Sequence, residues 1–337
     1  MRKWLVKGVG TLVVLGAVAI TSAYVYYDGQ INKPLKISSE PFLVERGDTL
    51  SSIAGELLDD GVISEPYTLK AYARLNDVDH IKAGEYQFPQ PITLSEFVEW
   101  LEKGKGQIGI KVTIVEGWTF KQMREMLAKA KKLKQLTTGW TDQQIMAELG
   151  MPELHPEGQF YPDTYQYRSG DSDLTILRKS FNLMQVILDE VWQQRKADIQ
   201  IKDKYEALIM ASIIEKESQV RDEQPEISGV FENRLRIGMR LQTDPTVIYG
   251  VGDAYDGDIT RKHLKTDTPY NTYTRHGLPP TPIALPGEQA IHAAVNPIET
   301  KALYFVAKGE GRHHFSKTLK EHNAAVQKYI LSKRNSG

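Results

Sequence analysis

The sequence predicts an α+β protein with an N-terminal transmembrane helix, a small subdomain and a larger mixed domain. Most segments space their apolar residues as amphipathic helices do, and short predicted strands are scattered among them, such as the β-branched segment Ile108–Val115 and the segment Leu303–Lys308. A doubly wound sheet would alternate strands and helices regularly, and the sequence has neither that order nor an internal repeat of fixed period. The transmembrane helix is predicted from the uncharged run Gly8–Tyr27.

The composition excludes several classes of protein. The chain has 337 residues, enough for two domains, and its net charge of -1 indicates no basic surface for nucleic acid. It has no cysteine, which rules out disulfides and thiol chemistry. The sequence also lacks a His-Glu-x-x-His pair, a Cys/His cluster and a phosphate-binding glycine loop. We therefore expect neither a metal nor another cofactor.

The N-terminus predicts a membrane anchor. About twenty apolar residues span the hydrocarbon core of a bilayer; Gly8–Tyr27 has that length and ends in tyrosines, which are typical of the membrane interface. The preceding tail, residues 1–7, is basic. That charge places the tail in the cytoplasm and the rest of the chain on the periplasmic side of the inner membrane. A cleaved signal peptide is the alternative, because Thr21–Ala23 are small, but the apolar run is longer than a typical signal h-region.

A small subdomain is predicted over residues 41–105. Residues 28–40 before it are polar and indicate a linker or a first irregular strand. The subdomain opens with a strand over Phe42–Val44, a turn, and a helix that starts at Thr49. Its further predicted elements are a helix near Pro66–Leu75, a strand over Lys82–Phe88, and a helix over Leu94–Lys103 capped by Thr93.

The larger domain is predicted over residues 106–337, after the boundary Gly104-Lys-Gly106. Its predicted strands are Ile108–Val115 and Leu303–Lys308, and a hairpin that starts with the second strand is predicted to end at His314–Phe315. The domain also has several predicted helices. These are Phe120–Lys132, Thr141–Leu149, Leu174–Arg195, Asp203–Arg221, Glu223–Gly238 and Leu319–Arg334. Predicted to be irregular are Pro152–Arg168, Asp258–Pro286 and the stretch Gln242–Asp244 before Pro245.

The predicted helix Asp203–Arg221 carries an acid on its apolar side. At about 100° per residue, Glu217 falls between Ile213 and Ile214, whereas Glu215 points to nearly the opposite side. A carboxyl group among apolar side chains loses hydration, which raises its pKa and lets it carry a proton near neutral pH, as a general acid requires. A structural ion pair of Glu217 with Arg221 is the alternative explanation of the same pattern.

An ordered set of motifs resembles one known family. The motifs are Glu215-Lys-Glu-Ser218, Val230–Gly250, Val115-Glu-Gly117, Pro156–Thr164, Pro269–Tyr273, Gly277–Pro280 and Tyr304–Val306. Over almost the whole chain after the N-terminal segment they resemble the endolytic murein transglycosylases, the MltG or YceG-like family. The resemblance implies that 106–337 is a YceG-like catalytic domain and that Glu217 is its catalytic glutamate.

The subdomain 41–105 resembles a second known module. Its strand, Gly-Asp-Thr-Leu turn and helix over Phe42–Leu58 resemble the opening of a LysM module. The resemblance implies binding of glycans that contain N-acetylglucosamine. A domain that only packs and spaces its neighbours is the alternative.

The reaction that the resemblance implies needs one acid. The family cleaves the β-1,4 bond between N-acetylmuramic acid and N-acetylglucosamine inside peptidoglycan glycan strands and leaves 1,6-anhydro ends. One carboxyl group can protonate the leaving oxygen and then accept the proton of the C6 hydroxyl, so no second carboxylate is needed as a nucleophile. An endolytic cut could end the elongation of nascent strands, and the resemblance suggests peptidoglycan synthases as partners.

Further residues are predicted to hold the substrate. Polar or aromatic side chains near the family motifs could grip hydroxyl and acetamido groups or stack on sugar rings. They are Ser218, Gln242, Thr243, Asp244, Tyr270, Asn271, Tyr273, Glu116 and Asp163. Each could instead support a loop, with Asn271 as a turn former and the tyrosines as loop core.

Two other functions remain open at this stage. A lysozyme-like hydrolase would use Glu217 as the acid and Asp244 as base or nucleophile. A membrane-anchored, non-catalytic glycan-binding scaffold would rely on the LysM-like subdomain alone. The ends of the products separate the first from a transglycosylase, and any release of soluble fragments excludes the second.

Overall fold

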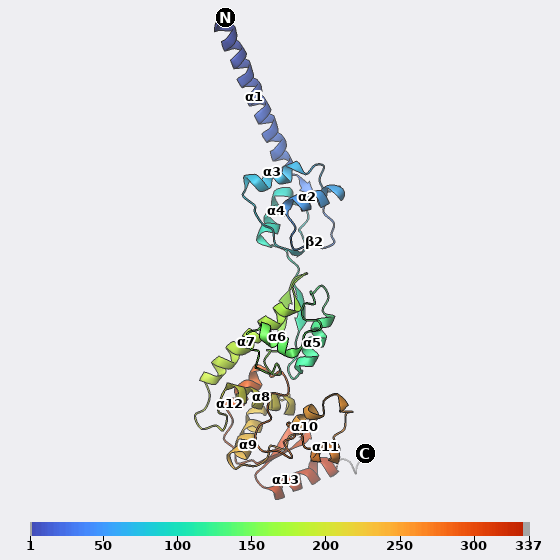
Figure 1. The fold of residues 1–337 in the computed structure, drawn as a ribbon, viewed down its shortest axis with the longest axis vertical. Coiled ribbons are helices and arrows are strands. Elements are labelled where there is room, and N and C mark those ends of the chain that lie inside the picture. Colours follow the sequence, from blue (N-terminus) through green and yellow to red (C-terminus); the bar gives the residue numbers. More distant parts are fainter. Residues whose placement is uncertain (1, 333–337) are drawn as a thin grey trace. The chain divides into compact units, whose positions relative to one another are not determined.

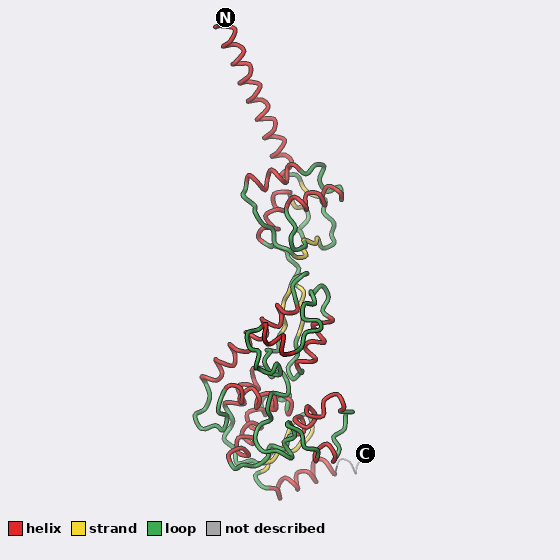
Figure 2. Tube along the Cα trace, in the orientation of Figure 1, coloured by secondary structure: helices red, strands yellow, loops and turns green. Residues whose placement is uncertain are grey.

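The structure of the chain is a computed structural model, which describes residues 2–332. The chain divides into two compact units (Figures 1 and 2). Unit 1 comprises Met1–Ile110, Lys132–Lys134 and Gln166–Asp171, and unit 2 comprises Lys111–Lys131, Gln135–Tyr165 and Ser172–Gly337. Helices are mixed with short two-stranded sheets, so the protein belongs to the α+β class that the sequence predicts.

Unit 1 combines one long helix with a small body. The long helix is α1 (Arg2–Ile31). In the body, β1 (Pro34–Leu35) pairs with β4 (Ile92–Thr93), and β2 (Phe42–Val44) pairs with β3 (Gly84–Tyr86), both antiparallel. Its helices are α2 (Leu50–Asp59), α3 (Tyr67–Leu75) and α4 (Leu94–Lys103). The predicted strands and helices of this region are thus present, within two or three residues of the expected bounds.

The segment Gly10–Ile31 of α1 is the one helix among the described residues that is long and apolar enough to cross a bilayer. Its side chains from Gly10 to Tyr26 are exposed. The helix continues past the predicted end at Tyr27, so the first part of the predicted linker 28–40 is helical, and Pro34–Leu35 forms the irregular strand.

Helix starts in unit 1 follow from their capping residues. The hydroxyl of Thr49 accepts a hydrogen bond from the backbone of Ser52 at the start of α2, and the hydroxyl of Thr93 accepts one from Glu96 at the start of α4. In each case the third helical residue returns a bond to the backbone of the cap, which satisfies amide groups that the helix itself leaves unpaired. Local sequence therefore determines where these helices begin.

Unit 2 is built around α8 (Lys204–Glu217), which packs against α7 (Asp173–Gln193), α9 (Gln224–Arg236) and α12 (Glu288–Val295). Every residue of α8 from Ala207 to Ile214 is buried, so the helix lies inside the main hydrophobic core. The other α-helices are α5 (Phe120–Lys129), α6 (Asp142–Glu148), α10 (Asp244–Val251), α11 (Arg261–Lys265) and α13 (Leu319–Val326). A short 3-10 helix, η1 (Gly252–Ala254), and a short π-helix, η2 (Gln327–Leu331), follow α10 and α13. The strands β7 (Tyr304–Gly309) and β8 (Arg312–Ser316) form a hairpin. The strands β5 (Ile110–Thr113) and β6 (Thr164–Tyr167), each with residues assigned to both units, pair with each other.

Three sequence expectations for the larger domain are wrong. The stretch after Gln242 is not irregular up to Pro245, because Asp244 begins α10 and Pro245 occupies its first turn, where a missing N–H is harmless. The loop Pro152–Arg168 ends in β6, and α11 lies inside the loop Asp258–Pro286. The predicted final helix is present over the described residues, as α13 up to Val326 and then as the π-helix η2. The helix α12, for which no prediction was made, contributes to the core.

A glycine in α9 allows a close backbone approach. A Cβ at Gly229 would collide with the carbonyl oxygen of Ile298. The backbone N–H of Ile298 donates a hydrogen bond of 2.9 Å to the carbonyl of Pro225, which holds this segment against α9. We expect Gly229→Ala to destabilise unit 2 by about 1–3 kcal/mol, because the packed segment must move to admit the methyl group. Urea unfolding measures this change.

A matched control is Gly55→Ala in α2, where a Cβ would meet no atom within 4 Å. Here the substitution of the helical glycine by alanine should stabilise unit 1 by about 0.5–1 kcal/mol, because it lowers the conformational entropy of the unfolded chain. A neutral effect of Gly229→Ala on the unfolding of unit 2 would contradict the close approach.

Candidate active site

The end of α8 places Glu217 where the helix leaves the core. Ser218 is extended, with φ of -146° and ψ of 126°, so the helix ends at Glu217 and not at the predicted Arg221. The side chain of Glu217 is only partly exposed. The helix is buried on all sides before this point, so the predicted apolar face is in fact the whole circumference, and Glu217 follows directly after it.

Burial and three neighbouring residues determine the charge state of Glu217. Burial is the main effect and raises the pKa of Glu217 to about 7. The hydroxyl of Thr243 donates a hydrogen bond to its Oε1 and favours the charged form, Asp244 nearby disfavours it, and the guanidinium of Arg234 favours it. The result is a carboxyl group that can hold or release a proton near neutral pH, as the sequence predicts for a general acid.

The ion-pair alternative does not hold for Glu217 in the described residues. Arg221 lies beyond the end of α8 and pairs with Glu116, with 3.1 Å between Nη2 and Oε2. Glu215 accepts a hydrogen bond of 3.0 Å from the backbone N–H of Gly287, so it holds a neighbouring loop. Burial also raises the pKa of Glu215. The two glutamates of the motif therefore have different partners.

The structure brings Thr243 and Asp244 next to Glu217. The backbone N–H of Thr243 donates to the hydroxyl of Thr272 at 3.0 Å, and this links the start of α10 to the loop 270–273. Across the same junction the hydroxyl of Tyr273 donates to Oδ1 of Asp244 at 2.6 Å. Gln242 adopts a positive φ of 48°, and its side chain is exposed. The two predicted binding segments are thus adjacent to each other and to Glu217.

Asn271 and Tyr270 have structural partners. The side chain of Asn271 is buried, and its Nδ2 lies 2.7 Å from the carbonyl of Thr266, while its Oδ1 accepts from the N–H of Tyr273 at 2.9 Å. Tyr270 packs on Tyr249 with ring centroids 4.8 Å apart, and its hydroxyl contacts that of Thr281 at 2.9 Å. These contacts agree with the alternative of loop support for both residues.

We therefore expect Asn271→Ala to reduce stability as well as activity. It would remove the buried amide that donates to the carbonyl groups of His263, Leu264 and Thr266, and the loss of such a donor typically costs about 1–3 kcal/mol. Thermal unfolding of the variant would reveal this loss. If the variant unfolded like the wild type and lost only substrate affinity, Asn271 would be a substrate contact and not a loop support.

The three remaining residues that were predicted to bind substrate, Ser218, Glu116 and Asp163, have other partners in the structure. Ser218 is buried, and its hydroxyl accepts a bond of 3.1 Å from the N–H of Val220, which shapes the turn after α8. Glu116 is exposed, pairs with Arg221 and acts electrostatically on the pKa of Glu215. Asp163 is exposed and accepts from the backbone N–H of Thr164 at 2.6 Å. The structure shows no contact of Asp163 with Glu217 among the described residues.

Two buried charged residues of unit 2 were missed by the sequence analysis. Arg234 of α9 is buried; its guanidinium donates to the carbonyl oxygens of Leu303 and Leu241, and its charge acts on Glu217. Glu157 is buried, and burial raises its pKa to about 7. Each lies inside a motif that resembles the family, which was the available signal, but nothing in the local pattern indicated burial.

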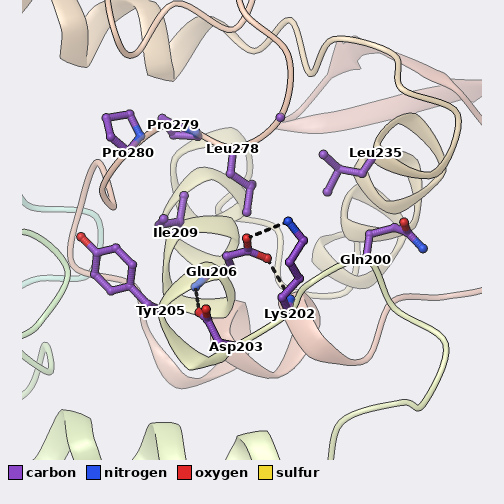
Figure 3. Close-up of a pocket in the computed structure, with 11 residues that line it drawn as sticks. Gln200, Lys202, Asp203, Tyr205, Glu206, Ile209, Leu235, Leu278, Pro279 and Pro280 are labelled. Carbon is purple, nitrogen blue, oxygen red and sulfur yellow. Dashed lines mark hydrogen bonds and ion pairs between the residues drawn. The ribbon is translucent and has the colours of Figure 1, made fainter.

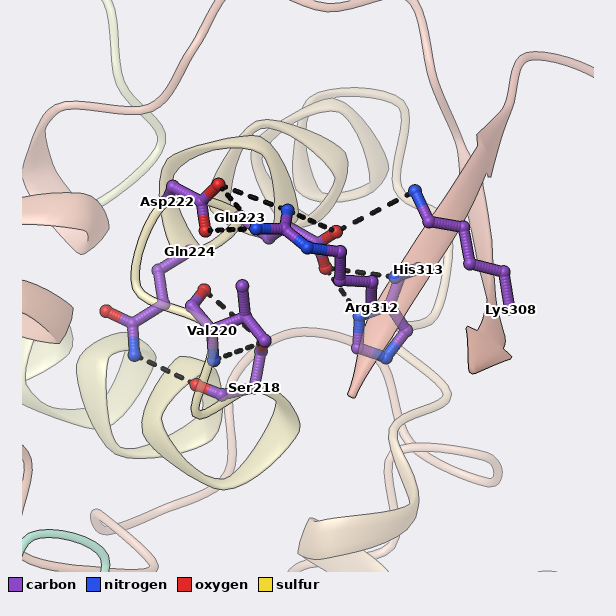
Figure 4. A network of polar contacts seen from close by, with 8 residues as sticks. All are labelled: Ser218, Val220, Asp222, Glu223, Gln224, Lys308, Arg312 and His313. Atoms are coloured by element: carbon purple, nitrogen blue, oxygen red, sulfur yellow. Dashed lines mark hydrogen bonds and ion pairs between the residues drawn. The ribbon is translucent and has the colours of Figure 1, made fainter. Parts of the chain in front are cut away.

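A polar network holds the segment that follows Glu217 (Figure 4). Glu223 is buried, and its Oε2 lies 3.0 Å from the backbone nitrogen and 3.1 Å from Nδ1 of His313 in β8. Arg312 of the same strand pairs with Asp222 at 3.1 Å. The side-chain amide of Gln224 donates to the carbonyl of Ser218 at 3.0 Å. The β7–β8 hairpin thereby holds in place residues 222 and 223, which follow Glu217 in the chain.

A separate pocket lies at the other end of α8. It has a volume of about 550 Å³ and is lined by the first turns of that helix, residues 203–209, and by the segment Gly277–Pro280 (Figure 3). Asp203 caps the helix there, and Glu206 pairs with Lys202. Since a helix rises about 1.5 Å per residue, Tyr205 in this pocket and Glu217 are separated by about 18 Å along α8.

No group of three or more His, Cys, Asp or Glu residues within residues 2–332 has the arrangement of a metal site. The fold and the site define an α+β protein with an apolar N-terminal helix and, at the end of a buried helix, a glutamate with a raised pKa. The chain belongs to the YceG-like family, whose model matches residues 42–328.

Comparison with known proteins identifies relatives of the same family. The chain is 32% identical over 308 residues to an endolytic murein transglycosylase of Bacillus subtilis, covering 86% of this chain and 84% of that protein. It is 24% identical to an endolytic murein transglycosylase of Streptococcus pneumoniae, covering 90% of this chain and 61% of that protein. The crystal structure of a protein described as YceG-like, from Listeria monocytogenes, has a TM-score of 0.55 and 32% identity over 85% of this chain and 99% of that chain.

Proposed function

We propose that the protein is an endolytic peptidoglycan lytic transglycosylase. It cleaves the β-1,4 bond between N-acetylmuramic acid and N-acetylglucosamine within glycan strands. The observation that carries this proposal is the carboxyl group of Glu217, whose pKa burial raises to about 7, next to the hydroxyl of Thr243. The relatives named endolytic murein transglycosylase support the substrate class.

Glu217 acts twice in the proposed mechanism. Its protonated carboxyl group donates the proton to the glycosidic oxygen as the bond from that oxygen to C1 breaks. The C6 hydroxyl of the muramic acid then attacks C1, and the carboxylate of Glu217 accepts the hydroxyl proton. No water is consumed, the product carries a 1,6-anhydro ring, and Glu217 ends in its starting state. A pKa near the working pH suits both steps.

Residues around Glu217 orient the two sugars in this proposal. Gln242 and Asp244 are exposed beside it, and the hydrogen bond of 2.6 Å from Tyr273 holds the carboxylate of Asp244 in place. Polar groups of this kind can bind hydroxyl and acetamido groups so that the C6 hydroxyl faces C1. Such positioning lowers the barrier because less freedom is lost in the reacting step.

Product analysis tests this function against hydrolysis. Purified glycan strands are digested with the wild type and with Asp244→Asn, and the ends are identified by mass spectrometry. We expect 1,6-anhydro ends from both proteins, because Glu217 alone performs the proton transfers. Reducing ends, together with a loss of cleavage in Asp244→Asn, would establish a lysozyme-like hydrolase. No soluble fragments from either protein would leave only a glycan-binding scaffold.

We also propose that α1 anchors the protein in the inner membrane, with the N-terminus in the cytoplasm and unit 2 in the periplasm. The basic tail before the apolar segment Gly10–Ile31 supports this orientation. In this setting the β2-α2-α3-β3 body, which we propose as a LysM-like glycan-binding module, lies between membrane and cell wall. Cleavage beside peptidoglycan synthases would then end the growth of nascent strands.

Alkaline carbonate extraction of membranes tests the anchor. The full-length protein should stay in the membrane fraction, because a spanning helix is not released by charge repulsion. A mature N-terminus near Tyr24, with the protein in the soluble fraction, would show instead that a signal peptide had been removed.

A further inference from the structure

One helix of unit 1 carries an exposed face that combines apolar and basic side chains. In α3, residues 67, 70, 71, 74 and 75 lie on one side at about 100° per residue. Tyr67 and Leu75 are 75% and 71% exposed, among the most exposed large apolar side chains of the described residues. Lys70 and Arg74 between them are also exposed, and the helix contains no acidic residue. The opposite side, with Leu69, is buried in the core of unit 1.

The position of α3 relates this face to the membrane. The last turns of α1 pack against α3 and α4, and Tyr27 and Gln30 are partly buried there, whereas α1 is exposed from Gly10 to Tyr26. Figure 1 shows α3 at the end of the body of unit 1 from which α1 extends. A helix is about 10 Å across, and the headgroup layer on each side of a bilayer is about 5–7 Å thick. A helix that touches the end of a spanning segment therefore lies at the level of the lipid headgroups.

We propose that the exposed face of α3 rests on the headgroup layer of the bilayer that α1 spans. Tyr67 and Leu75 enter the membrane interface, and Lys70 and Arg74 bind anionic phospholipid headgroups. Amphipathic helices with basic polar residues and exposed aromatic or aliphatic side chains bind membrane surfaces in this way. The inference rests on the proposed membrane anchor, and it adds that unit 1 is held against the bilayer by a second contact.

The chemistry of the face distinguishes this partner from a glycan. Leu75 offers an aliphatic group without a polar partner, which suits acyl chains and not sugar hydroxyls. The two cations favour an anionic surface over a neutral one. The covalent tether through α1 keeps the face close to the membrane, so even weak contacts are occupied for much of the time because the effective concentration is high.

Fluorescence quenching by lipids tests the proposal on the full-length chain. The sequence has no cysteine, so single cysteines introduced as Leu75→Cys, Leu15→Cys or Val186→Cys can each carry one fluorophore. Leu15 lies in α1 and reports the anchor, while Val186 lies in α7 of unit 2 and is 52% exposed, a matched aliphatic control. The proteins are reconstituted in vesicles of phosphatidylcholine and phosphatidylglycerol that contain a phospholipid with a nitroxide near its headgroup.

We expect quenching of the probe at residue 75 at least twofold stronger than at residue 186. Quenching at residue 15 with residue 75 no different from residue 186 would overturn the contact of α3 and leave the anchor intact. A lack of quenching at residue 15 would overturn the anchor itself, and the inference with it.

A charge reversal tests the role of the two basic residues. In the Leu75→Cys background, Lys70→Glu with Arg74→Glu should weaken quenching, as should vesicles of phosphatidylcholine alone. The charge-matched control Lys301→Glu with Lys320→Glu, on exposed residues of unit 2, should leave quenching unchanged. Equal quenching in all of these samples would overturn the binding of anionic headgroups.

Discussion

Glu217→Gln should lower the rate of glycan cleavage by about 10²–10⁴-fold, the usual contribution of a general acid. The amide has nearly the shape of the carboxyl group but cannot donate its proton to the leaving oxygen. The hydroxyl of Thr243, which donates to Oε1 of Glu217, can donate equally to the amide oxygen, so the local structure should be kept. The measurement is the release of 1,6-anhydro fragments from purified strands, followed by mass spectrometry.

Glu215→Gln is the matched control, because Glu215 lies two residues before Glu217 in the same helix and the same motif. Its amide oxygen can still accept the bond of 3.0 Å from Gly287, so we expect most of the activity to remain. The proposed mechanism would be refuted if Glu217→Gln retained wild-type activity or if Glu215→Gln lost as much.

The stability of Glu217→Gln provides a check that the loss is chemical. The pKa of Glu217 is raised from 4.5 to about 7, so between these values the folded chain keeps a proton that the unfolded chain has released. The stability that this proton contributes is fully present below about pH 4.5 and is lost as the pH rises through 7. Glutamine does not titrate. We therefore expect the variant to gain stability relative to the wild type as the pH rises, measured by urea unfolding at pH 5 and pH 8.

The pH dependence of cleavage should change when Thr243 is replaced by valine. Activity of the wild type requires the protonated form of Glu217, so kcat/KM should fall about tenfold per pH unit well above the pKa of about 7. The hydrogen bond from Thr243 lowers that pKa, and valine removes the hydroxyl while keeping the shape. The alkaline limb of the profile should therefore move to higher pH in Thr243→Val.

Thr243→Ser is the control for this shift, because serine keeps the hydroxyl and loses only a methyl group. Its alkaline limb should coincide with that of the wild type. A Thr243→Val profile with an unchanged limb, or one moved to lower pH, would show that the hydroxyl does not act on the proton of Glu217.

Much of the fold could be predicted from the sequence where local rules decide it. Capping threonines such as Thr49 and Thr93 mark helix starts, because they satisfy amide groups within three residues of themselves. The β-branched run Ile108–Val115 predicts the strand β5 for a similarly local reason. The apolar N-terminal segment predicts α1 from its length and composition alone.

Predictions failed where neighbours in space decide the structure. The stretch Gln242–Asp244 was predicted to be irregular up to Pro245, yet Asp244 begins α10, where Thr243 and Thr246 both bond to Thr272. The helix α8 was expected to continue to Arg221, but it ends at Glu217 because Ser218 has an extended backbone. The side-chain amide of Gln224 donates to the carbonyl of Ser218 there. Such contacts join residues far apart in sequence, and no local pattern encodes them.

The sequence by itself determined the class of fold, the family resemblance and the choice of Glu217 as the acid. Only the tertiary structure decided what surrounds that acid. It assigns Arg221 to Glu116, places Thr243 on the carboxyl group, and turns Asn271 inward to hold its own loop. The physical reason is that a helix repeat can predict which side of a helix a carboxyl group occupies. Its pKa depends on the burial and the hydrogen-bond donors that other segments supply.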